Sequence, residues 1–399
     1  MTLFRSALVL GLLSAVGPFA IDMYLPALPA IEADLRTDVA SAQLTLTAFF
    51  VAFGLSQLVY GPWADQAGRK RPLYTGLGIF IAGSIGCALA PSIEMLTLFR
   101  LIQGLGAAVV MVVPRAIIRD MHTGTQATRM MAMVMLVVSV SPMLAPLAGS
   151  GLIAVGDWRL IFWVLGVAAV CSLFITATVP PETLPPAARV KVNIASLWRG
   201  AKVLFRDPVF MGLTFIGGFG MASFFVFIAS ASFVYTRQFG LSPTGFSLAF
   251  AVNALGFFAA SQLAAPLGER VGIVPLMRYA VIGFAVFTVT LFALALMGVA
   301  TLPVIIVFLF CANACLGLVI PTTMVMALDA HGDIAGLASS LGGTLQMLAG
   351  GMMIAITGLF FDGTATPMIA AIMCCALGAL VLAKITLGRI REEAAPTAV

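Results

Sequence analysis

The sequence predicts an all-α membrane protein with twelve transmembrane helices arranged as two six-helix halves. Of the 399 residues, 61% are hydrophobic and 9% are charged, whereas a soluble domain has about 25% charged residues. The apolar residues form separate blocks, each long enough to cross a bilayer as a helix. One sizeable polar interval divides these blocks into six and six. A soluble globular fold is therefore excluded.

Charged residues mark the ends of the apolar blocks, and a transmembrane helix needs about 20 predominantly apolar residues. The longest uncharged run, residues 279–328, is long enough for two helices with a break near residues 297–303. The other ten predicted spans are residues 6–28, 41–62, 73–92, 95–114, 130–154, 160–180, 209–234, 243–266, 336–360 and 364–386.

Basic residues indicate the orientation of these helices. If the N-terminus is cytoplasmic, fifteen Lys and Arg residues fall in inner loops and only Arg36, Arg159 and Arg237 fall in outer loops. Cytoplasmic loops carry such an excess of positive charge, so we expect both termini in the cytoplasm. We expect residues 6–28 to be a retained helix rather than a signal peptide. The net charge of +5 mostly reflects this bias and predicts no nucleic-acid partner.

Residues 181–207 are predicted to be a cytoplasmic linker between an N-terminal half, residues 1–180, and a C-terminal half, residues 208–399. The interval contains a run of prolines followed by five basic residues. An internal repeat supports this division, because the eight residues that start at Gly61 and at Ala265 align without a gap at an offset of 204. Parallel six-helix repeats are one layout of secondary transporters.

Two motifs resemble those of the major facilitator superfamily. The stretch Gly61-Pro-Trp-Ala-Asp-Gln-Ala-Gly-Arg-Lys-Arg is similar to the loop signature of that family, with Gln66 where the family has Arg. Arg100-Leu-Ile-Gln-Gly-Leu-Gly resembles its fourth-helix motif. The run Ile21-Asp-Met-Tyr-Leu-Pro-Ala-Leu-Pro is similar to the first-helix signature of its Bcr/CflA drug-export subfamily, and Trp158-Arg-Leu-Ile-Phe extends the resemblance to the sixth helix.

The fifth predicted helix contains Pro142-Met-Leu-Ala-Pro-Leu-Ala-Gly, which looks like the fifth-helix motif of antiporters in that family. Pro142 and Pro146 remove two backbone donors, and Gly149 and Gly151 offer small faces for close packing. Such a helix can act as a pivot or seal, or it can simply be bent.

The loop after the second predicted helix combines an acid, glycines and a basic cluster. Gly61 and Gly68 permit close backbone approach and unusual turns. Asp65 can accept hydrogen bonds from a neighbouring helix N-terminus, where the helix dipole favours an anion. Together with Arg69, these residues are candidates for a conformational latch, a role that rests mostly on the resemblance. The alternative is that Asp65 caps a turn and Arg69 only sets topology.

Asp22 and Arg100 are charged residues that lie within predicted spans rather than in loops. Asp22 lies 17 positions after Arg5, about 25 Å along a helix, and Arg100 lies 19 positions before Arg119, about 28 Å along its own helix. The two are therefore at similar depth. Intramembrane acids are functional candidates by default. The resemblance implies that both helices line a central cavity, where the two side chains can pair. Alternatively, Asp22 is solvated at the outer mouth and Arg100 anchors a helix end.

Polar and aromatic residues within the spans are candidates for the substrate cavity, although polar residues can equally link helices. The candidates are Tyr24, Gln103, Phe224, Asn253 and Asn313. A cavity with aromatic residues, methionines and few charges suits a moderately apolar, loosely specified compound.

The resemblance implies a proton-coupled exporter of drug-like molecules that works by alternating access, in a bacterial cytoplasmic membrane. Asp22 would be the site of protonation and Arg100 its modulator. We expect a monomer without cofactor, driven by the proton gradient, whose partners are a small amphipathic substrate, protons and the lipid bilayer. The alternatives are a proton-coupled transporter of a metabolite, such as a nucleoside or amino acid derivative, and, more remotely, an integral membrane enzyme.

Neither an enzyme nor a metal site is favoured by the residues present. All six cysteines fall in predicted spans, and Cys311 and Cys315 have no His or carboxylate in the same span to complete a metal site. His122 and His331 fall in inner loops, where we expect them to be solvated.

Overall fold

The computed structural model describes residues 3–122, 124–178, 182–189 and 193–394, and every regular element in these ranges is helical. The long helices are α1 (Leu3–Asp22), α3 (Val39–Ala67), α4 (Lys70–Ala88), α5 (Ile93–Ala107), α6 (Val109–Met121), α7 (Gly124–Val155), α8 (Arg159–Thr178), α10 (Pro208–Arg237), α11 (Pro243–Val271), α12 (Ile273–Leu296), α13 (Leu302–Asp329), α14 (Ala335–Gly358) and α15 (Thr366–Ala394). The short ones are η1 (Leu25–Ala27), α2 (Leu28–Asp34), η2 (Pro186–Ala188), α9 (Ile194–Arg206) and η3 (Gly332–Ile334).

The long helices occupy the twelve predicted spans, with α5 and α6 sharing the fourth. Among the described residues, 11 helical segments are long and apolar enough to cross a membrane. The remaining helix, α4, has 19 residues that begin with Lys70 and Arg71 and include several glycines, which lowers its mean hydropathy. The predicted fold class, an all-α membrane protein, is confirmed.

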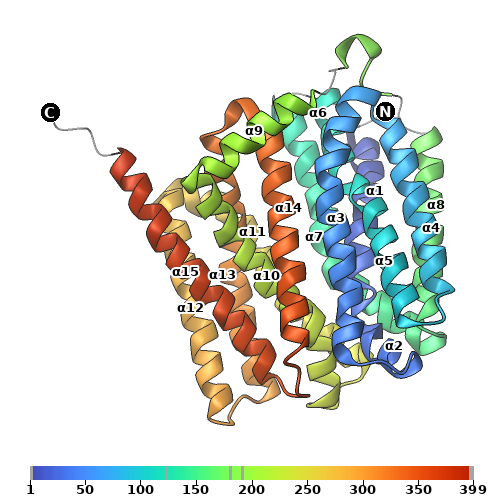
Figure 1. Ribbon diagram of the computed structural model, residues 1–399, viewed down its shortest axis with the longest axis vertical. Helices are drawn as coiled ribbons and strands as arrows, with labels where there is room; N and C mark the ends of the chain where they lie inside the picture. Colours follow the sequence, from blue (N-terminus) through green and yellow to red (C-terminus); the bar gives the residue numbers. More distant parts are fainter. Residues whose placement is uncertain (1–2, 123, 179–181, 190–192, 395–399) are drawn as a thin grey trace. The chain divides into compact units, whose positions relative to one another are not determined.

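The chain forms two compact units (Figure 1). Unit 1 contains residues 1–193 and 241–251, and unit 2 contains residues 194–240 and 252–399. In unit 1, α1 packs against α7, α3 packs against α5, and α4 packs against both α5 and α8. In unit 2, α10 packs against α13, α14 and α15, and α12 packs against α13 and α15.

The first span is broken in its second half. The helix α1 ends at Asp22, and the chain continues through η1 into α2. Pro26 lies four residues after Asp22 and has no N–H to donate to the Asp22 carbonyl, so the α-helical ladder cannot continue there. The break frees carbonyl groups at the end of α1, and a helix C-terminus is a favourable place for a cation.

Beyond this break, α2 is fixed to the start of α8. Asp34 accepts hydrogen bonds from Trp158 Nε1 (3.0 Å) and from Arg159 Nη1 (2.8 Å). Arg159 also forms an ion pair with Asp157 at 2.9 Å, and its guanidinium lies over the Trp158 ring at 4.2 Å from the centroid. These contacts give a structural reason for the Trp-Arg pair directly before the sixth predicted span.

The predicted linker includes the helix α9, which packs against α10 and α14 in unit 2. Leu204 is fully buried, whereas Trp198 and Phe205 are exposed. A basic residue, Arg206, ends this helix, and Asp207 caps the start of α10 by accepting hydrogen bonds from the backbone N–H groups of Val209 and Phe210.

Candidate functional site

Arg100 is the largest fully buried side chain of unit 1, with none of its surface exposed. Its Nη1 donates to the carbonyl O of Ala20 (3.1 Å), in the last turn of α1, and to Gln103 Oε1 (2.5 Å). The guanidinium lies over the rings of Tyr24 and Phe49, at 4.6 and 4.3 Å from the centroids. Carbonyl oxygens and aromatic faces both attract a cation. The break in the first span therefore provides the place where Arg100 is held.

Arg100 reaches α1 because glycines bring α5 close to its neighbours. A Cβ added to Gly104 would lie 2.4 Å from the Phe49 carbonyl O in α3, and one added to Gly106 would lie 2.4 Å from the Gly76 carbonyl O in α4. Real Cβ atoms do not approach backbone so closely. The two glycines of the Gln-Gly-Leu-Gly part of the fourth-helix motif thus allow the close helix packing that positions Arg100.

Asp22 lies at the C-terminal end of α1, two residues after Ala20, and is 4% exposed. The Arg100–Ala20 hydrogen bond confirms that Asp22 and Arg100 are at similar depth. The predicted ion pair between them is absent, however. No hydrogen bond or ion pair joins the Asp22 carboxyl to any residue that the structure describes. Arg100 instead uses Nη1 for Ala20 and Gln103, and its Nε and Nη2 have no acceptor within the described part of the chain.

Tyr24 and Gln103 are enclosed inside unit 1 and connect helices. Tyr24 shares a hydrogen bond of 2.7 Å with the Thr45 hydroxyl in α3, and its ring lies 5.6 Å from that of Phe162 in α8. Gln103 accepts from Arg100 and donates to Ser84 Oγ (2.8 Å) in α4. Both side chains thus support Arg100, and a role in substrate binding stays a prediction for them.

A second charged cluster joins α3, α4 and α6. Arg69, which is 5% exposed, lies between α3 and α4. It donates from Nη1 to Asp65 (2.6 Å) and from Nε and Nη2 to the two oxygens of Asp120 (2.7 and 3.0 Å). Thr183 also donates to Asp120 (3.0 Å). Such a bidentate Arg–carboxylate pair fixes geometry as well as adding energy.

Glu182 occupies the N-terminus of α4, the kind of place predicted for Asp65. Its carboxylate accepts hydrogen bonds from the backbone N–H groups of Arg69 (2.8 Å), Lys70 (3.1 Å) and Leu184 (3.1 Å). The pKa of Glu182 lies below its ordinary value, because partial burial raises it but these backbone amides and the charge of Arg189 lower it by more. The prediction for Asp65 is therefore wrong in this respect: Asp65 pairs with Arg69 instead.

The two glycines of this loop behave differently. Gly68 has a φ of 90°, and a Cβ there would lie 2.7 Å from Glu182 Oε2, so both the turn and the approach of Glu182 need glycine. Gly61 lies within α3, and a Cβ there would meet nothing within 4 Å. The close approach predicted at Gly61 is therefore not made to any residue that the structure describes.

Pro142 and Pro146 both lie inside α7. Gly149, one turn further on, is in close contact: a Cβ there would lie 2.1 Å from the Met23 carbonyl O, in the turn that follows Asp22. A Cβ at Gly151 would meet no described atom within 4 Å, so the close packing predicted for Gly151 is not found among the described residues.

The predicted cavity residues of unit 2 are distributed over three helices. Phe224 in α10 is 8% exposed and stacks on Phe257 in α11, with centroids 5.2 Å apart. Asn253 in α11 and Asn313 in α13 are buried. The Nδ2 of Asn313 has no acceptor among the residues described.

His331 is paired rather than solvated, which corrects the prediction. Its Nε2 donates to Asp207 Oδ2 (2.8 Å), and its ring packs edge-on against Phe210, with centroids 5.5 Å apart.

Sequence reasoning missed three acids, Asp120, Glu182 and Asp207. Each lies in or beside a predicted inner loop rich in basic residues, where an acid is a natural partner, and that excess of opposite charge was the available signal.

No group of three or more His, Cys, Asp or Glu side chains in the described residues is arranged to hold a metal ion.

Comparisons with known proteins match most of the chain to transporters. The family model described as "Major Facilitator Superfamily" matches residues 10–354. The chain is 32% identical over 390 residues, 97% of this chain and 96% of the relative, to the "Uncharacterized MFS-type transporter YdgK" of Bacillus subtilis. It is 27% identical over 372 residues, 93% of each chain, to a "Bicyclomycin resistance protein homolog" of Haemophilus influenzae. Among solved structures, a D-xylose-proton symporter matches with a TM-score of 0.76 at 15% identity and 97% coverage of both chains.

Proposed function

Because this chain belongs to the major facilitator superfamily of secondary transporters, we propose that it is a proton-coupled antiporter of the Bcr/CflA kind that exports drug-like molecules. The Haemophilus influenzae relative is named for bicyclomycin resistance. A second relative, the "Multidrug resistance protein D" of Escherichia coli, is 28% identical over 88% of each chain. Both names support an exporter, and the bacterial sources of these relatives support a location in the cytoplasmic membrane.

The observation that carries the proposal is the environment of Asp22. Asp22 is 4% exposed and lies inside a membrane-spanning segment, and its carboxyl has no polar partner in the described chain. An isolated ionised carboxylate in such a place costs several kcal/mol. The protonated acid is compatible with this buried position, and the ionised acid needs water or a cation. Proton binding and release at Asp22 would therefore accompany a change in its access to solvent.

Arg100 would supply the cation in the other state. The Nε and Nη2 groups of Arg100 have no acceptor among the described residues. Its Nη1 donates to the Ala20 carbonyl O, in the same helical turn as Asp22. A small shift of this turn would allow an ionised Asp22 to accept from Arg100. A cationic or polar substrate group would compete with the proton for the same carboxylate, which is the requirement for exchange.

We assign the latch role to the cluster of Asp65, Arg69, Asp120 and Glu182. It joins the ends of α3, α4 and α6 to the segment that follows α8. Opening of this end of unit 1 would have to break several charge-assisted hydrogen bonds together. Gln66 stands where the family has Arg and makes no hydrogen bond to a described residue, so it adds no contact to the proposed latch.

The test uses everted membrane vesicles with an acidified interior. A transported drug added outside should release protons from the vesicles, and Asp22→Asn should abolish this release while leaving the amount of folded protein unchanged. Asp38→Asn is the matched control, because Asp38 is an exposed cap of α3 and Asn caps a helix as well as Asp does. Normal drug-driven proton release by Asp22→Asn would sink the proposal.

The same vesicles test the alternative substrate class. A panel of nucleosides and amino acid derivatives is added in place of the drugs. Proton release with a metabolite and not with any drug would keep Asp22 as the coupling residue and reassign the substrate.

A further inference from the structure

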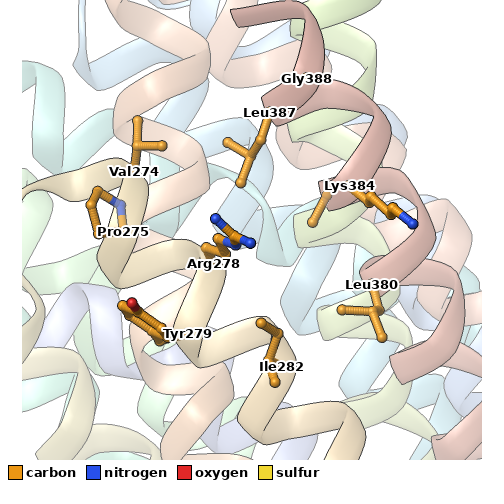
Figure 2. A pocket seen from close by; sticks show the side chains of 10 residues that line it. Val274, Pro275, Arg278, Tyr279, Ile282, Leu380, Lys384, Leu387 and Gly388 are labelled. Atoms are coloured by element: carbon orange, nitrogen blue, oxygen red, sulfur yellow. The ribbon is translucent and has the colours of Figure 1, made fainter. Parts of the chain in front are cut away.

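A cavity of about 480 Å³ lies between α12 and α15 in unit 2. It lies where the first turns of α12 face the last turns of α15, and Figure 2 shows Arg278 extending from α12 toward Leu387 of α15, with Lys384 on the next turn of α15. Its wall is mostly apolar. The lining residues are Val274, Pro275, Arg278, Tyr279, Ile282, Leu380, Ala383, Lys384, Leu387 and Gly388.

The charges of this cavity are both positive. Arg278 and Lys384 line it, and the lining contains no Asp or Glu. Neither cation forms a hydrogen bond or an ion pair with a residue that the structure describes. Two cations in one cavity repel each other unless an anion is present. The cavity is therefore complementary to a negatively charged ligand.

The depth of the two cations is that of a lipid headgroup. Arg278 is the sixth residue of α12, and Lys384 lies five residues before Arg389 near the end of α15. Arg278 is thus about 8 Å from the start of α12, and Lys384 is about 8 Å along α15 from the exposed Arg389. By the distribution of basic residues along the chain, these ends face the cytoplasm. That leaflet carries the anionic lipids in cells, and its surface potential attracts basic residues.

The surroundings of the cavity are those of a lipid-facing surface. On α12, Tyr279 is 71% exposed and Val286 is 56% exposed; on α15, Val381 is 58% exposed. Exposed apolar side chains on membrane-spanning helices are solvated by acyl chains, and a tyrosine at this depth is typical of the membrane interface. A soluble anion would have to leave water to enter this place, whereas a phospholipid is already there.

We propose that the cavity between α12 and α15 binds an anionic phospholipid, with the headgroup phosphate between Arg278 and Lys384 and the acyl chains along Ile282, Leu380 and Val381. The guanidinium of Arg278 offers a planar pair of donors for phosphate oxygens, and the ammonium of Lys384 adds a point charge. This inference is independent of the transported substrate.

Binding is measured by native mass spectrometry on protein purified in detergent and titrated with phosphatidylglycerol or phosphatidylethanolamine. The wild type should retain one phosphatidylglycerol in preference to phosphatidylethanolamine. The double variant R278Q/K384Q should bind phosphatidylglycerol about 30-fold more weakly, since each cation near the surface contributes a factor of roughly five. Raising the salt concentration should reduce the difference.

The matched control is R270Q/R389Q, which removes the same charge from exposed positions outside the cavity. It should retain the wild-type affinity. Thermal unfolding without lipid should be the same for all three proteins, which shows that each is folded. Equal phosphatidylglycerol affinity of the wild type and R278Q/K384Q overturns the proposal. So does inorganic phosphate that displaces the lipid at equal concentration, because the site would then be one for a soluble anion.

Discussion

Replacement of Glu182 by Gln tests whether the anion at the start of α4 stabilises the latch. The variant keeps the shape of the side chain and removes its charge. Of the two carboxylate oxygens, Oε1 accepts from Arg69 and Leu184 and Oε2 accepts from Lys70. Gln can retain one oxygen, so its NH₂ group must face a backbone donor. At least one of the three hydrogen bonds is therefore lost.

The cost follows from these contacts. Loss of one hydrogen bond with its donor left unpaired costs about 1 kcal/mol. Loss of an anion at a helix N-terminus costs roughly 0.3–1 kcal/mol, towards the lower end here because Glu182 is partly exposed. We expect a destabilisation of about 1–2 kcal/mol, and a fall in the hydrogen-exchange protection of the Arg69 and Lys70 amides by about tenfold.

The effect should depend on pH with a defined sign. Since the folded-state pKa of Glu182 is lowered, its stabilisation is complete above the unfolded value of about 4.3 and is lost as the pH falls through the folded value. The wild type should therefore unfold at a higher temperature than Glu182→Gln at pH 7, and the difference should shrink below about pH 4.

Hydrogen exchange at residues 68–72 and thermal unfolding at both pH values measure these effects. The control is Glu269→Gln, because Glu269 is exposed and makes no described hydrogen bond or ion pair. Equal protection of the Arg69 and Lys70 amides in the variant and the wild type at pH 7 would refute the reasoning.

Three further predictions follow from single contacts. Gly104→Ala should lower stability by about 1–3 kcal/mol by overpacking against α3, whereas Gly61→Ala should be neutral or stabilising by up to about 1 kcal/mol; thermal unfolding of the pair compares them, and equal effects would contradict the packing argument. Tyr24→Phe should cost about 1 kcal/mol through the lost hydrogen bond to Thr45 and should have no effect in a Thr45→Val background, as a double-mutant cycle would show. Asp207→Ala should cost about 1–2 kcal/mol through the lost cap of α10, and Asp207→Asn should recover most of it; failure of Asn to do so would assign the effect to the pair with His331 instead.

The helices were predictable because membrane-spanning segments are specified locally. Apolar runs bounded by charges gave all twelve spans, and even the division of residues 279–328 falls where α12 ends and α13 begins. The depth of Asp22 and Arg100 was predictable for the same reason, since the helical rise converts sequence separation into distance.

Pairing between distant segments was not predictable in this way. Glu182 and Arg69 are separated by 113 positions, and Arg100 and Ala20 by 80. Nothing in the local sequence shows that Arg100 prefers a freed carbonyl and two aromatic faces to Asp22. The break after Asp22 did have a signal, in Pro26, but its consequence for Arg100 depends on the packing of α5 against α1, α3 and α4.

The contact between Gly149 and the Met23 carbonyl has a mechanical consequence. Most helix contacts are made by side chains, which can change rotamer and so absorb a displacement. This contact joins main chain to main chain and has no rotamer to change. A tilt of α7 at Pro142 and Pro146 would therefore displace the turn after Asp22 directly. The contact thus couples α7 to the turn beside Asp22, the only acid in α1. The stiffness of α7 determines how much of a displacement of this helix is transmitted to Asp22.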